Sequence, residues 1–474
     1  MTDIKRAVPA ARAAGRGFHA YSAKHLDTLV QRAGLAPAER LAVRAVASVL
    51  PFRTNSYVVE NLIDWDAAPD DPIYRLVFPQ PDMLPATDVR RLADLISGGA
   101  PDAALRAAAH EIRLRLNPQP AGQLLLNAPS LHGRPLPGLQ HKYPETVLFF
   151  PRQGQTCHAY CSYCFRWAQF VDEPDLKMAT DDIGMLVAYL GEHPEVTSVL
   201  VTGGDPMIMG EPVLRRYLGP LIDPRNGLDQ LESIRIGTKS LAYWPQRFVT
   251  DPDADATLRL FGEVVSSGRT LAVMAHFSHP RELAPALLGE AVRRIASTGA
   301  VIRTQAPLIR SINDDAAAWQ AMWRTQVRMG MVPYYMFVER DTGPQDYFAV
   351  PLARGYDIFR EAYQGVSGLC RTVRGPSMSA TPGKVCVDGV AELAGVKVFV
   401  LRMIQAREPQ LVGLPFFARF DPAATWLTDL EPVFTDRFPY EPARYQAAAD
   451  ELPGLWPDGP SDPKEPGELM VPAI

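Results

Sequence analysis

The stretch Cys157-His-Ala-Tyr-Cys161-Ser-Tyr-Cys164-Phe-Arg166 decides how the rest of the chain is interpreted. It places three of the protein's 5 cysteines within eight residues, in the spacing C-x3-C-x2-C. An apolar run at 147–150 precedes it, so the three thiols are predicted to converge on one point from a loop. Iron–sulfur clusters are normally held by four thiolates, and three cysteines would leave one iron open to an external ligand. The alternatives are three buried thiols or a zinc site, which usually needs four ligands in two separated pairs.

The composition describes an ordinary globular protein. The chain has 474 residues, of which 47% are apolar and 21% charged, with a net charge of −5. This balance gives no indication of a nucleic-acid partner, and no apolar run approaches the roughly 20 residues needed to cross a bilayer. The cysteines do not form a disulfide framework, and residues 1–24 lack the apolar segment of a signal peptide. We therefore expect a cytoplasmic protein with a partly helical N-terminal tail and no membrane partner.

The spacing of apolar residues predicts helices at first and alternating strands and helices later. Helical periodicity covers 22–50, 87–98 and 101–115. The predicted strands are 146–150, 197–202, 233–237, 271–276, 300–304 and 332–337, and the predicted helices between them are 180–192, 255–267, 283–298 and 315–329. Such alternation favours parallel strands with crossover helices. The fold class is therefore α/β, with six units forming a partial TIM-like barrel, (β/α)6, because a closed barrel has eight.

The chain is expected to divide into three regions. Residues 1–140 form a helical N-terminal region, 141–395 the partial barrel with every candidate site, and 396–474 an irregular C-terminal extension that wraps around the barrel. Polar and glycine residues follow the predicted strands, at the end where sheets of this kind place their chemistry.

The cysteine spacing resembles the signature of the radical S-adenosylmethionine (SAM) enzymes. In that family the residues matching Cys157, Cys161 and Cys164 hold a [4Fe–4S] cluster, SAM binds the open iron, and its cleavage gives a radical that abstracts hydrogen from a substrate. The segment Thr202-Gly-Gly-Asp-Pro-Met207 follows the second predicted strand. Taken alone it is compatible with any turn. After the cluster loop, it is similar to the segment that contacts SAM, which implies that Gly203, Gly204 and Asp205 bind this cofactor.

Further motifs narrow the resemblance to the lysine 2,3-aminomutase family. They keep their order between about residues 50 and 390, and they are 61–66, 135–144, 234–238, 244–247, 276–280, 305–310, 312–314 and 333–335. The resemblance implies a small amino-acid substrate, a reducing electron donor of the flavodoxin or ferredoxin type, and a possible homo-oligomer. It also implies that His276 and Gln305 line the SAM pocket, although either residue could instead be a satisfied polar group of the core.

The same resemblance implies a second cofactor, pyridoxal 5′-phosphate (PLP). Family members bind PLP through a lysine in a glycine-rich segment, and the matching stretch here is Ser379-Ala-Thr-Pro-Gly-Lys384. Thr-Pro-Gly replaces several glycines, so a solvated loop lysine is the alternative. Arg166 matches the arginine that pairs with the substrate α-carboxylate, since a guanidinium binds a carboxylate through two parallel hydrogen bonds. The alternative for Arg166 is a surface arginine.

The sequence departs from the family where lysine-specific members place two aspartates against the distal ammonium of lysine. Counted from the neighbouring motifs, these positions fall on Arg340, which precedes Asp341, and on Ser377. A cation at the first position would repel a lysine side chain and suit an acidic one, and glutamate-type members are similar in having a basic residue there. The hypothesis is a 2,3-aminomutase for an acidic amino acid such as glutamate. A one-residue bulge that turned Asp341 inward would undo it.

Other functions fit parts of the pattern. A radical SAM epimerase or dehydrogenase acting on an amino acid or peptide would suit a chain in which Lys384 binds no PLP. A lysine 2,3-aminomutase with a rearranged pocket is a further alternative. A non-catalytic descendant that acts as a binding partner disagrees with the intact cysteines and with Arg166.

Overall fold

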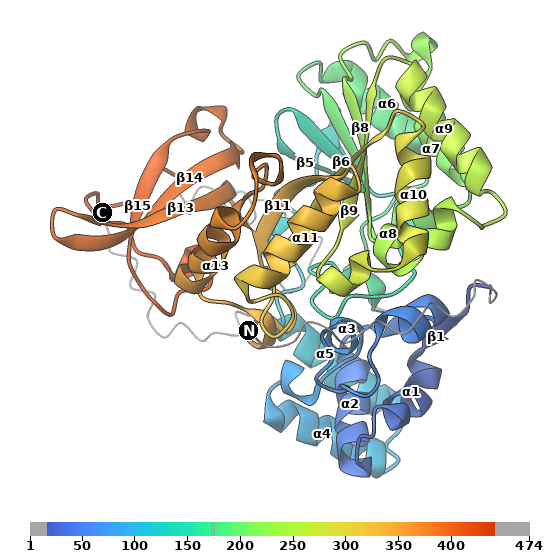
Figure 1. Cartoon of the computed structure of the whole chain (residues 1–474), viewed down its shortest axis with the longest axis vertical. Coiled ribbons are helices and arrows are strands. Elements are labelled where there is room, and N and C mark those ends of the chain that lie inside the picture. Colours follow the sequence, from blue (N-terminus) through green and yellow to red (C-terminus); the bar gives the residue numbers. More distant parts are fainter. Residues whose placement is uncertain (1–16, 172, 174–175, 441–474) are drawn as a thin grey trace.

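The computed structural model describes residues 17–440, except 172, 174 and 175. Figure 1 shows a helical N-terminal region, a central sheet covered by helices, and an antiparallel C-terminal sheet that projects to one side. The tails predicted at the two ends of the chain lie mostly in residues 1–16 and 441–474, outside the described part. None of the described helices is long and apolar enough to cross a membrane.

The described part of the N-terminal region contains five α-helices and two short two-stranded sheets, the second formed by β3 Ser130–Leu131 and β4 Arg134–Pro135. The helices are α1 Leu26–Arg32, α2 Pro37–Val49, α3 Pro72–Val77, α4 Ala86–Ser97 and α5 Asp102–Arg115. The prediction of continuous helix over 22–50 is wrong, because Gly34 adopts a φ of 74° after α1 and Pro37 starts a new helix. Strand β1, Ala20–Ser22, instead pairs with β2, Arg53–Asn55.

The central sheet contains all six predicted parallel strands. They are β6 Thr146–Phe149, β7 Ser198–Val201, β8 Ser233–Thr238, β9 Thr270–His276, β10 Val301–Leu308 and β11 Val332–Val338. Each pairs in parallel with the next. Strand β5, Leu139–Tyr143, adds an antiparallel edge beside β6. The partial α/β barrel predicted from the sequence is thus confirmed.

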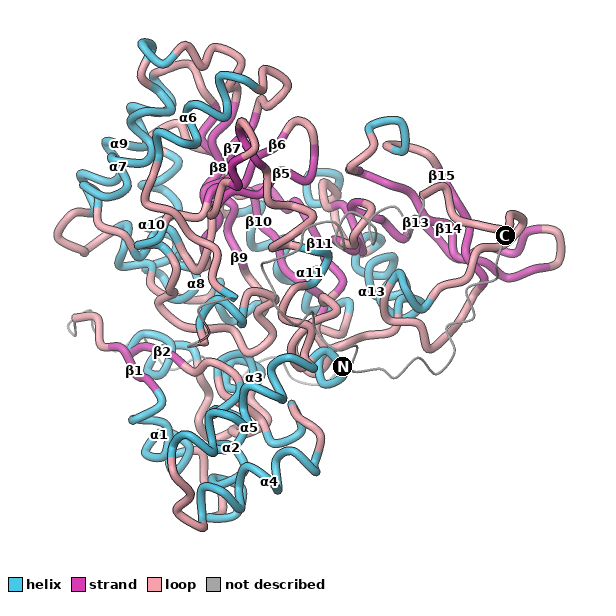
Figure 2. Tube along the Cα trace, turned by 180° about the vertical axis from the view of Figure 1, so that it is seen from behind, coloured by secondary structure: helices cyan, strands magenta, loops and turns pink. Residues whose placement is uncertain are grey.

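Helices cover the outer face of this sheet (Figures 1 and 2). They are α6 Ile183–Glu192, α7 Glu211–Ile222, α9 Ala254–Ser266, α10 Ala286–Ala296 and α11 Ala316–Arg328. Each buries one apolar stripe, as α9 does with Leu260, Phe261 and Val264. Only α7 was not predicted, because Pro212, Gly219 and Pro220 disturb its periodic pattern.

The C-terminal part continues the same sheet. After α13, Leu352–Gln364, strand β12, Arg374–Ser379, joins β11 in parallel. Strands β13 Gly383–Leu393, β14 Val396–Ala406 and β15 Pro415–Arg419 then add antiparallel pairs, giving eleven strands in the order β15 to β5. The expected boundary at 395/396 falls in the β13–β14 turn, where Ala394 and Gly395 have positive φ. The strand that carries Lys384 and the C-terminal extension are therefore one hairpin.

Side chains bridge the open side of this partial barrel. The Nζ of Lys142, on β5, donates to the carbonyl of Ala380, which lies between β12 and β13. Arg407, just after β14, donates to the carbonyl of Thr381 at 2.8 Å and to the side chain of Asn127. These contacts tie the last strands of the barrel to its first.

Candidate active site

A cavity of about 320 Å³ occupies the interior of the barrel. The carboxyl ends of the strands contribute the three cysteines, the glycine turn after β7, His276 and Arg340 to its walls. The interior also contributes Arg235 of β8 and Lys384 of β13. The chemistry was expected at the strand ends alone, whereas the cavity continues between the strands.

Cys157, Cys161 and Cys164 all line this cavity. Burial raises the pKa of each thiol, that of Cys164 to about 12, so a bound cation would be needed to hold the thiolates. Among the described residues, no three His, Cys, Asp or Glu side chains are arranged around a single metal ion. The charges of Cys161 and Cys164 also raise the pKa of Cys157, so the three sulfurs lie near one another in the cavity wall. Three neighbouring thiols with no fourth cysteine beside them in the motif fit an iron–sulfur cluster that leaves one iron open.

The N-terminal region holds the cysteine loop in place. The backbone N–H groups of Tyr160 and Ser162 donate to the carbonyls of Arg53 and Leu76, each at 2.8 Å. The side chain of Asn55 donates to the carbonyl of His158 at 3.2 Å. The function of this helical region is therefore, in part, to fix the geometry of the cluster loop.

The glycine turn packs directly on the same loop. A Cβ at Gly204 would lie 2.4 Å from the carbonyl oxygen of Thr156, and a Cβ at Gly203 would lie 2.2 Å from the side chain of Gln155. The φ of Gly203 is also 146°, which disfavours other residues. Glycine is therefore needed at these two positions for the close packing of the turn against the cysteine loop. The sequence had led us to expect glycine there for the close approach of a ligand.

The carboxylate of Asp205 is fully engaged by the protein. It accepts hydrogen bonds from Thr238 and Ser240 and from the backbone N–H groups of Met207 and Lys239. Burial raises the pKa of Asp205 and these donors oppose the shift. Asp205 therefore lines the cavity but serves mainly to join the glycine turn to the end of β8.

His276 and Gln305, at neighbouring positions of β9 and β10, face the cavity and contact each other. The Nε2 atoms of the two side chains lie 2.7 Å apart. The glutamine nitrogen is the donor, because an amide NH2 group cannot accept a hydrogen bond. Burial lowers the pKa of His276 to about 3, so the ring is neutral and its Nε2 can accept. The two residues form one polar unit in the cavity wall.

Two guanidinium groups lie over the same aromatic ring in the cavity. The Cζ atoms of Arg166 and Arg340 are 5.0 Å and 4.9 Å from the ring centre of Phe165. Burial lowers the pKa of both, that of Arg166 to about 10. The Nε and one terminal nitrogen of Arg340 are buried without a hydrogen-bond partner. Buried unpaired donors are costly, so this pair of cations is suited to anionic ligand groups.

Asp341 and Ser377 do not line the cavity, unlike the other predicted site residues. Arg340 faces the interior and Asp341 does not, so the bulge that would turn Asp341 inward is absent from this loop. Ser377 is fully buried in β12, with its hydroxyl unpaired, while Ser379 reaches the cavity instead. Of the pocket positions counted from the sequence, Arg340 lies in the cavity wall, whereas Asp341 and Ser377 lie outside it.

Lys384 points into the cavity from the start of β13. Its Nζ donates to Gln405 Oε1 at 2.9 Å and lies 4.2 Å from the ring centre of Tyr335. Burial, with Arg235 and Arg374 nearby, lowers the pKa of Lys384 to about 7. A solvated loop lysine is excluded by this burial. An amine that is partly neutral near pH 7 is a suitable nucleophile for a carbonyl.

Three charged residues of the cavity wall were missed from the sequence. Lys142 and Arg235 bring cations close to Lys384. Glu339, which is 5% exposed, lines the cavity beside Arg340, and burial raises its pKa well above the usual range. Lys142 lies inside the motif 135–144, which had pointed to the family but not to the cavity.

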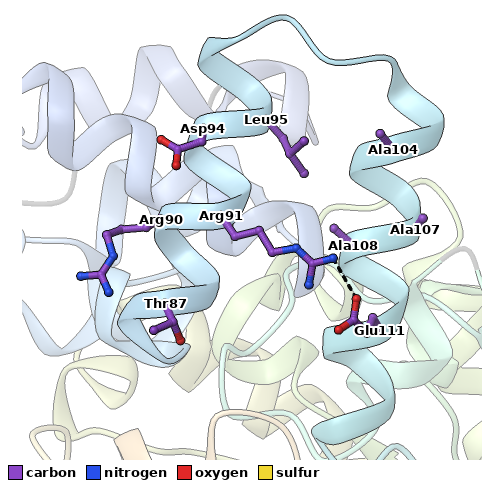
Figure 3. A pocket seen from close by; sticks show the side chains of 9 residues that line it. All are labelled: Thr87, Arg90, Arg91, Asp94, Leu95, Ala104, Ala107, Ala108 and Glu111. Atoms are coloured by element: carbon purple, nitrogen blue, oxygen red, sulfur yellow. Dashed lines mark hydrogen bonds and ion pairs between the residues drawn. The ribbon is translucent and has the colours of Figure 1, made fainter.

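A second, larger groove lies on the surface between α4 and α5 (Figure 3). Its volume is about 860 Å³, and an ion pair of 2.9 Å between Arg91 and Glu111 crosses it. Small side chains, among them Ala104 and Ala107, form its floor. It contains none of the predicted site residues, so the candidate active site is the barrel cavity.

A partial α/β barrel with a three-cysteine loop after its first parallel strand and a glycine turn after its second is the arrangement that the resemblance to radical SAM enzymes implies. No protein-family model matches the chain. A putative L-lysine 2,3-aminomutase from Aquifex aeolicus is 29% identical over 391 residues, which cover 82% of this chain and 90% of that protein. L-lysine 2,3-aminomutase from Fusobacterium nucleatum is 28% identical, and glutamate 2,3-aminomutase from Clostridioides difficile is 24% identical. Each of these two matches covers 49% of this chain and 51% of the other protein.

The chain is thus similar over most of its length to one putative L-lysine 2,3-aminomutase, and over about half of its length to named lysine and glutamate 2,3-aminomutases. Among solved structures, a radical SAM methyltransferase from Sphaerobacter thermophilus covers 62% of this chain and 94% of its own, at 16% identity and a TM-score of 0.34. A structural similarity with so low a TM-score carries no argument about the function of this chain.

Proposed function

We propose that the protein is a PLP-dependent 2,3-aminomutase for an amino acid with a side-chain carboxylate, such as glutamate. The observation that carries this proposal is the pair of buried guanidinium groups of Arg166 and Arg340 over one phenylalanine ring. Two fixed cations in a poorly solvated cavity favour a ligand with two carboxylates and disfavour a distal ammonium. The relatives include both lysine and glutamate 2,3-aminomutases, so the choice of substrate is argued from the cavity.

The residues of the cavity fit the cofactors that the family implies. Cys157, Cys161 and Cys164 would hold the [4Fe–4S] cluster, and the turn at Gly203 and Gly204 would lie beside SAM. Lys384 would hold PLP, close to further cations that suit its phosphate. When bound, the cluster and SAM would supply the radical that removes a substrate hydrogen, and PLP would carry the migrating amino group.

The chain's own residues bind and orient the substrate in this proposal. Arg166 holds the α-carboxylate and Arg340 the side-chain carboxylate, each through charge-assisted hydrogen bonds. The aromatic side chains of Phe165, Tyr335 and Phe337 line the same cavity and exclude water around the reacting carbons. Burial raises the pKa of Glu339 and so favours its neutral form, which opposes an anionic ligand less than a carboxylate would.

The alternative substrate is lysine, and one specific observation favours it. Glu339 places a carboxyl group in the cavity wall, where its ionised form could pair with an ammonium. The raised pKa of Glu339 counts against this reading, because the neutral form binds a cation poorly. A radical SAM epimerase or dehydrogenase would need no amine in the cavity, whereas Lys384 is buried there.

A test replaces Arg340 by methionine and compares acidic and basic substrates. The reconstituted enzyme would receive SAM, a reductant and either glutamate or lysine, and mass spectrometry would follow β-amino acids and 5′-deoxyadenosine. Loss of hydrogen bonds to a charged group costs about 1.5–3 kcal/mol, so kcat/KM for glutamate should fall roughly 10- to 100-fold. Arg310→Met, at an exposed arginine, is the control. An unchanged substrate preference in Arg340→Met would refute the acidic pocket.

We also propose where the protein works and how it receives electrons. All 5 cysteines are unpaired, which suits a reducing compartment such as the cytoplasm. The electron donor would be a small reducing protein of the flavodoxin or ferredoxin type. Measuring the reduction of the reconstituted cluster by each donor, followed by electron paramagnetic resonance, tests this proposal.

A further inference from the structure

Strand β14 supplies a partner for Lys384 that no sequence motif indicated. Lys384 stands opposite Gln405 in the β13–β14 register, and its Nζ donates to Gln405 Oε1 at 2.9 Å. The Nε2 of Gln405 donates in turn to Glu145 Oε1 at 2.7 Å. A chain of two hydrogen bonds therefore runs from the lysine amine to a carboxylate.

This chain fixes which way the amide of Gln405 points. Its NH2 group must face the Glu145 carboxylate, which can only accept hydrogen bonds when ionised. The amide oxygen is then directed at Lys384 and cannot rotate away without placing oxygen against oxygen. Glu145 thereby sets the orientation of the amide and acts on the lysine through Gln405.

The backbone around Lys384 is shaped for the same contact. The register shifts between Lys384 and Val385, which is the mark of a β-bulge, and bulges re-aim side chains next to active sites. A Cβ at Gly383 would lie 2.4 Å from the carbonyl oxygen of Gln405, so the two strands meet closely at this point. The ring of Tyr335 limits the lysine amine on another side, 4.2 Å away.

The hydrogen-bond chain also crosses the open side of the barrel. Glu145 lies between β5 and β6, at the start of the sheet, while Gln405 belongs to the hairpin after its last parallel strand. The position of the lysine amine is thus set jointly by the two ends of the partial barrel.

We propose that Gln405 is a positioning residue that holds Lys384 in the cavity, and that Glu145 acts through Gln405 by fixing its amide. The proposal rests on the proposed function, in which Lys384 binds PLP. It assigns the C-terminal hairpin a part in the active site, in addition to the wrapping role expected from the sequence.

The test measures attachment of PLP to Lys384 directly. The full-length reconstituted protein would be incubated with PLP over a range of concentrations and pH, reduced with borohydride, and digested. Mass spectrometry then gives the fraction of Lys384 that carries the pyridoxyl group, independently of turnover. Gln405→Met removes the hydrogen bonds and keeps the length of the side chain. Gln410→Met is the matched control, because Gln410 is exposed and its Nε2 donates to the side chain of Glu408 at 2.9 Å.

The expected result has two parts. Well above pH 7, where the amine is neutral, Gln405→Met should need about fivefold more PLP for half-labelling, the equivalent of one hydrogen bond of about 1 kcal/mol. At saturating PLP, the pH at which half of Lys384 is labelled should be lower in Gln405→Met. The protonated amine has lost a hydrogen-bond acceptor, so the pKa of Lys384 falls. Glu145→Gln should give a smaller change in the same direction, since its amide can still accept from Gln405. The Gln410→Met control should behave as the unsubstituted protein.

Each contrary outcome has a distinct meaning. If the unsubstituted protein is not labelled at Lys384, the proposed PLP site fails. If it is labelled and both Gln405→Met and Glu145→Gln match it in PLP and pH dependence, the positioning inference is overturned. Should Gln405→Met not fold, Glu145→Gln and Gln405→Asn, whose amide is one methylene shorter, decide by the same two measurements.

Discussion

Replacing Gly204 by alanine should release the cluster far faster, because the new methyl group would collide with the backbone of the cysteine loop. Its Cβ would lie 2.4–2.6 Å from three backbone atoms of Thr156, whereas ordinary contact begins near 3.4 Å. Backbone atoms cannot rotate aside, so the two loops must separate by about 1 Å, judged from these distances. Thr156 directly precedes the proposed cluster ligand Cys157, so the movement reaches the proposed iron site.

The energetic cost follows from the same contacts. The N–H of Asp205 donates to the carbonyl of Thr156 at 2.7 Å, and this hydrogen bond would be lost after such a shift. Overpacking costs typically about 1–3 kcal/mol, and the hydrogen bond adds about 0.5–1.5 kcal/mol. A total of about 2–4 kcal/mol corresponds to iron release that is on the order of 100-fold faster.

The assay is the rate at which an iron chelator removes iron from the reconstituted protein under anaerobic conditions. Gly262→Ala in α9 is the control, because a Cβ there meets nothing within 4 Å and a helical alanine is favourable. If Gly204→Ala released iron at the rate of the control, the contact with Thr156 would not be what selects glycine at this position.

Two further variants test the docking of the N-terminal region and the state of the substrate pocket. Arg281→Met leaves the fully buried Asp71 without its ion-pair partner, at a cost of about 3–5 kcal/mol. Hydrogen exchange of α3, which Asp71 caps through the N–H of Tyr74, should then accelerate by about two orders of magnitude or more. Arg225→Met, which removes an exposed ion pair, should change little. Glu339→Gln should preserve turnover of an acidic substrate near neutral pH, because burial raises the pKa of Glu339 and keeps it neutral in the original protein. As pH rises through that raised pKa, the original carboxylate becomes charged and KM for the acidic substrate should increase, whereas the KM of Glu339→Gln should not. Equal pH profiles for the two proteins would contradict this account.

Strand β9 was predictable because it is buried on both faces. Its residues 271–275 are all buried and form a continuous apolar run. The C-terminal hairpin was not predictable in the same way. Strand β13 contains Asp388 and Gly389 and is half exposed beyond them, so its apolar pattern fades before the strand ends. Its partner β14 gave a strand-like run, but nothing local indicated the pairing.

The residues of the candidate site also differ in how far the sequence predicts them. The cysteines and the glycine turn form local motifs, which is why sequence alone identified them. Gln405 and Glu145 are 260 positions apart, and neither is part of a motif. Their contact depends on closure of the barrel, a property of the tertiary structure. Glu339 was missed for another reason, because β11 ends at Val338 and both following side chains reach the cavity, which strand alternation does not predict.

The unusual Thr-Pro-Gly segment before Lys384 can also be explained by tertiary contacts. Only Gly383 faces a backbone close enough to exclude a side chain, at 2.4 Å from the carbonyl oxygen of Gln405. The carbonyls of Thr381 and Pro382 both accept hydrogen bonds from Arg407, through its Nε at 2.8 Å and its backbone N–H at 3.1 Å. A loop pinned in this way does not need the conformational freedom of several glycines, and proline lowers the entropy that the unfolded loop would lose on folding. The departure from the family pattern is therefore compatible with a lysine held in place for catalysis.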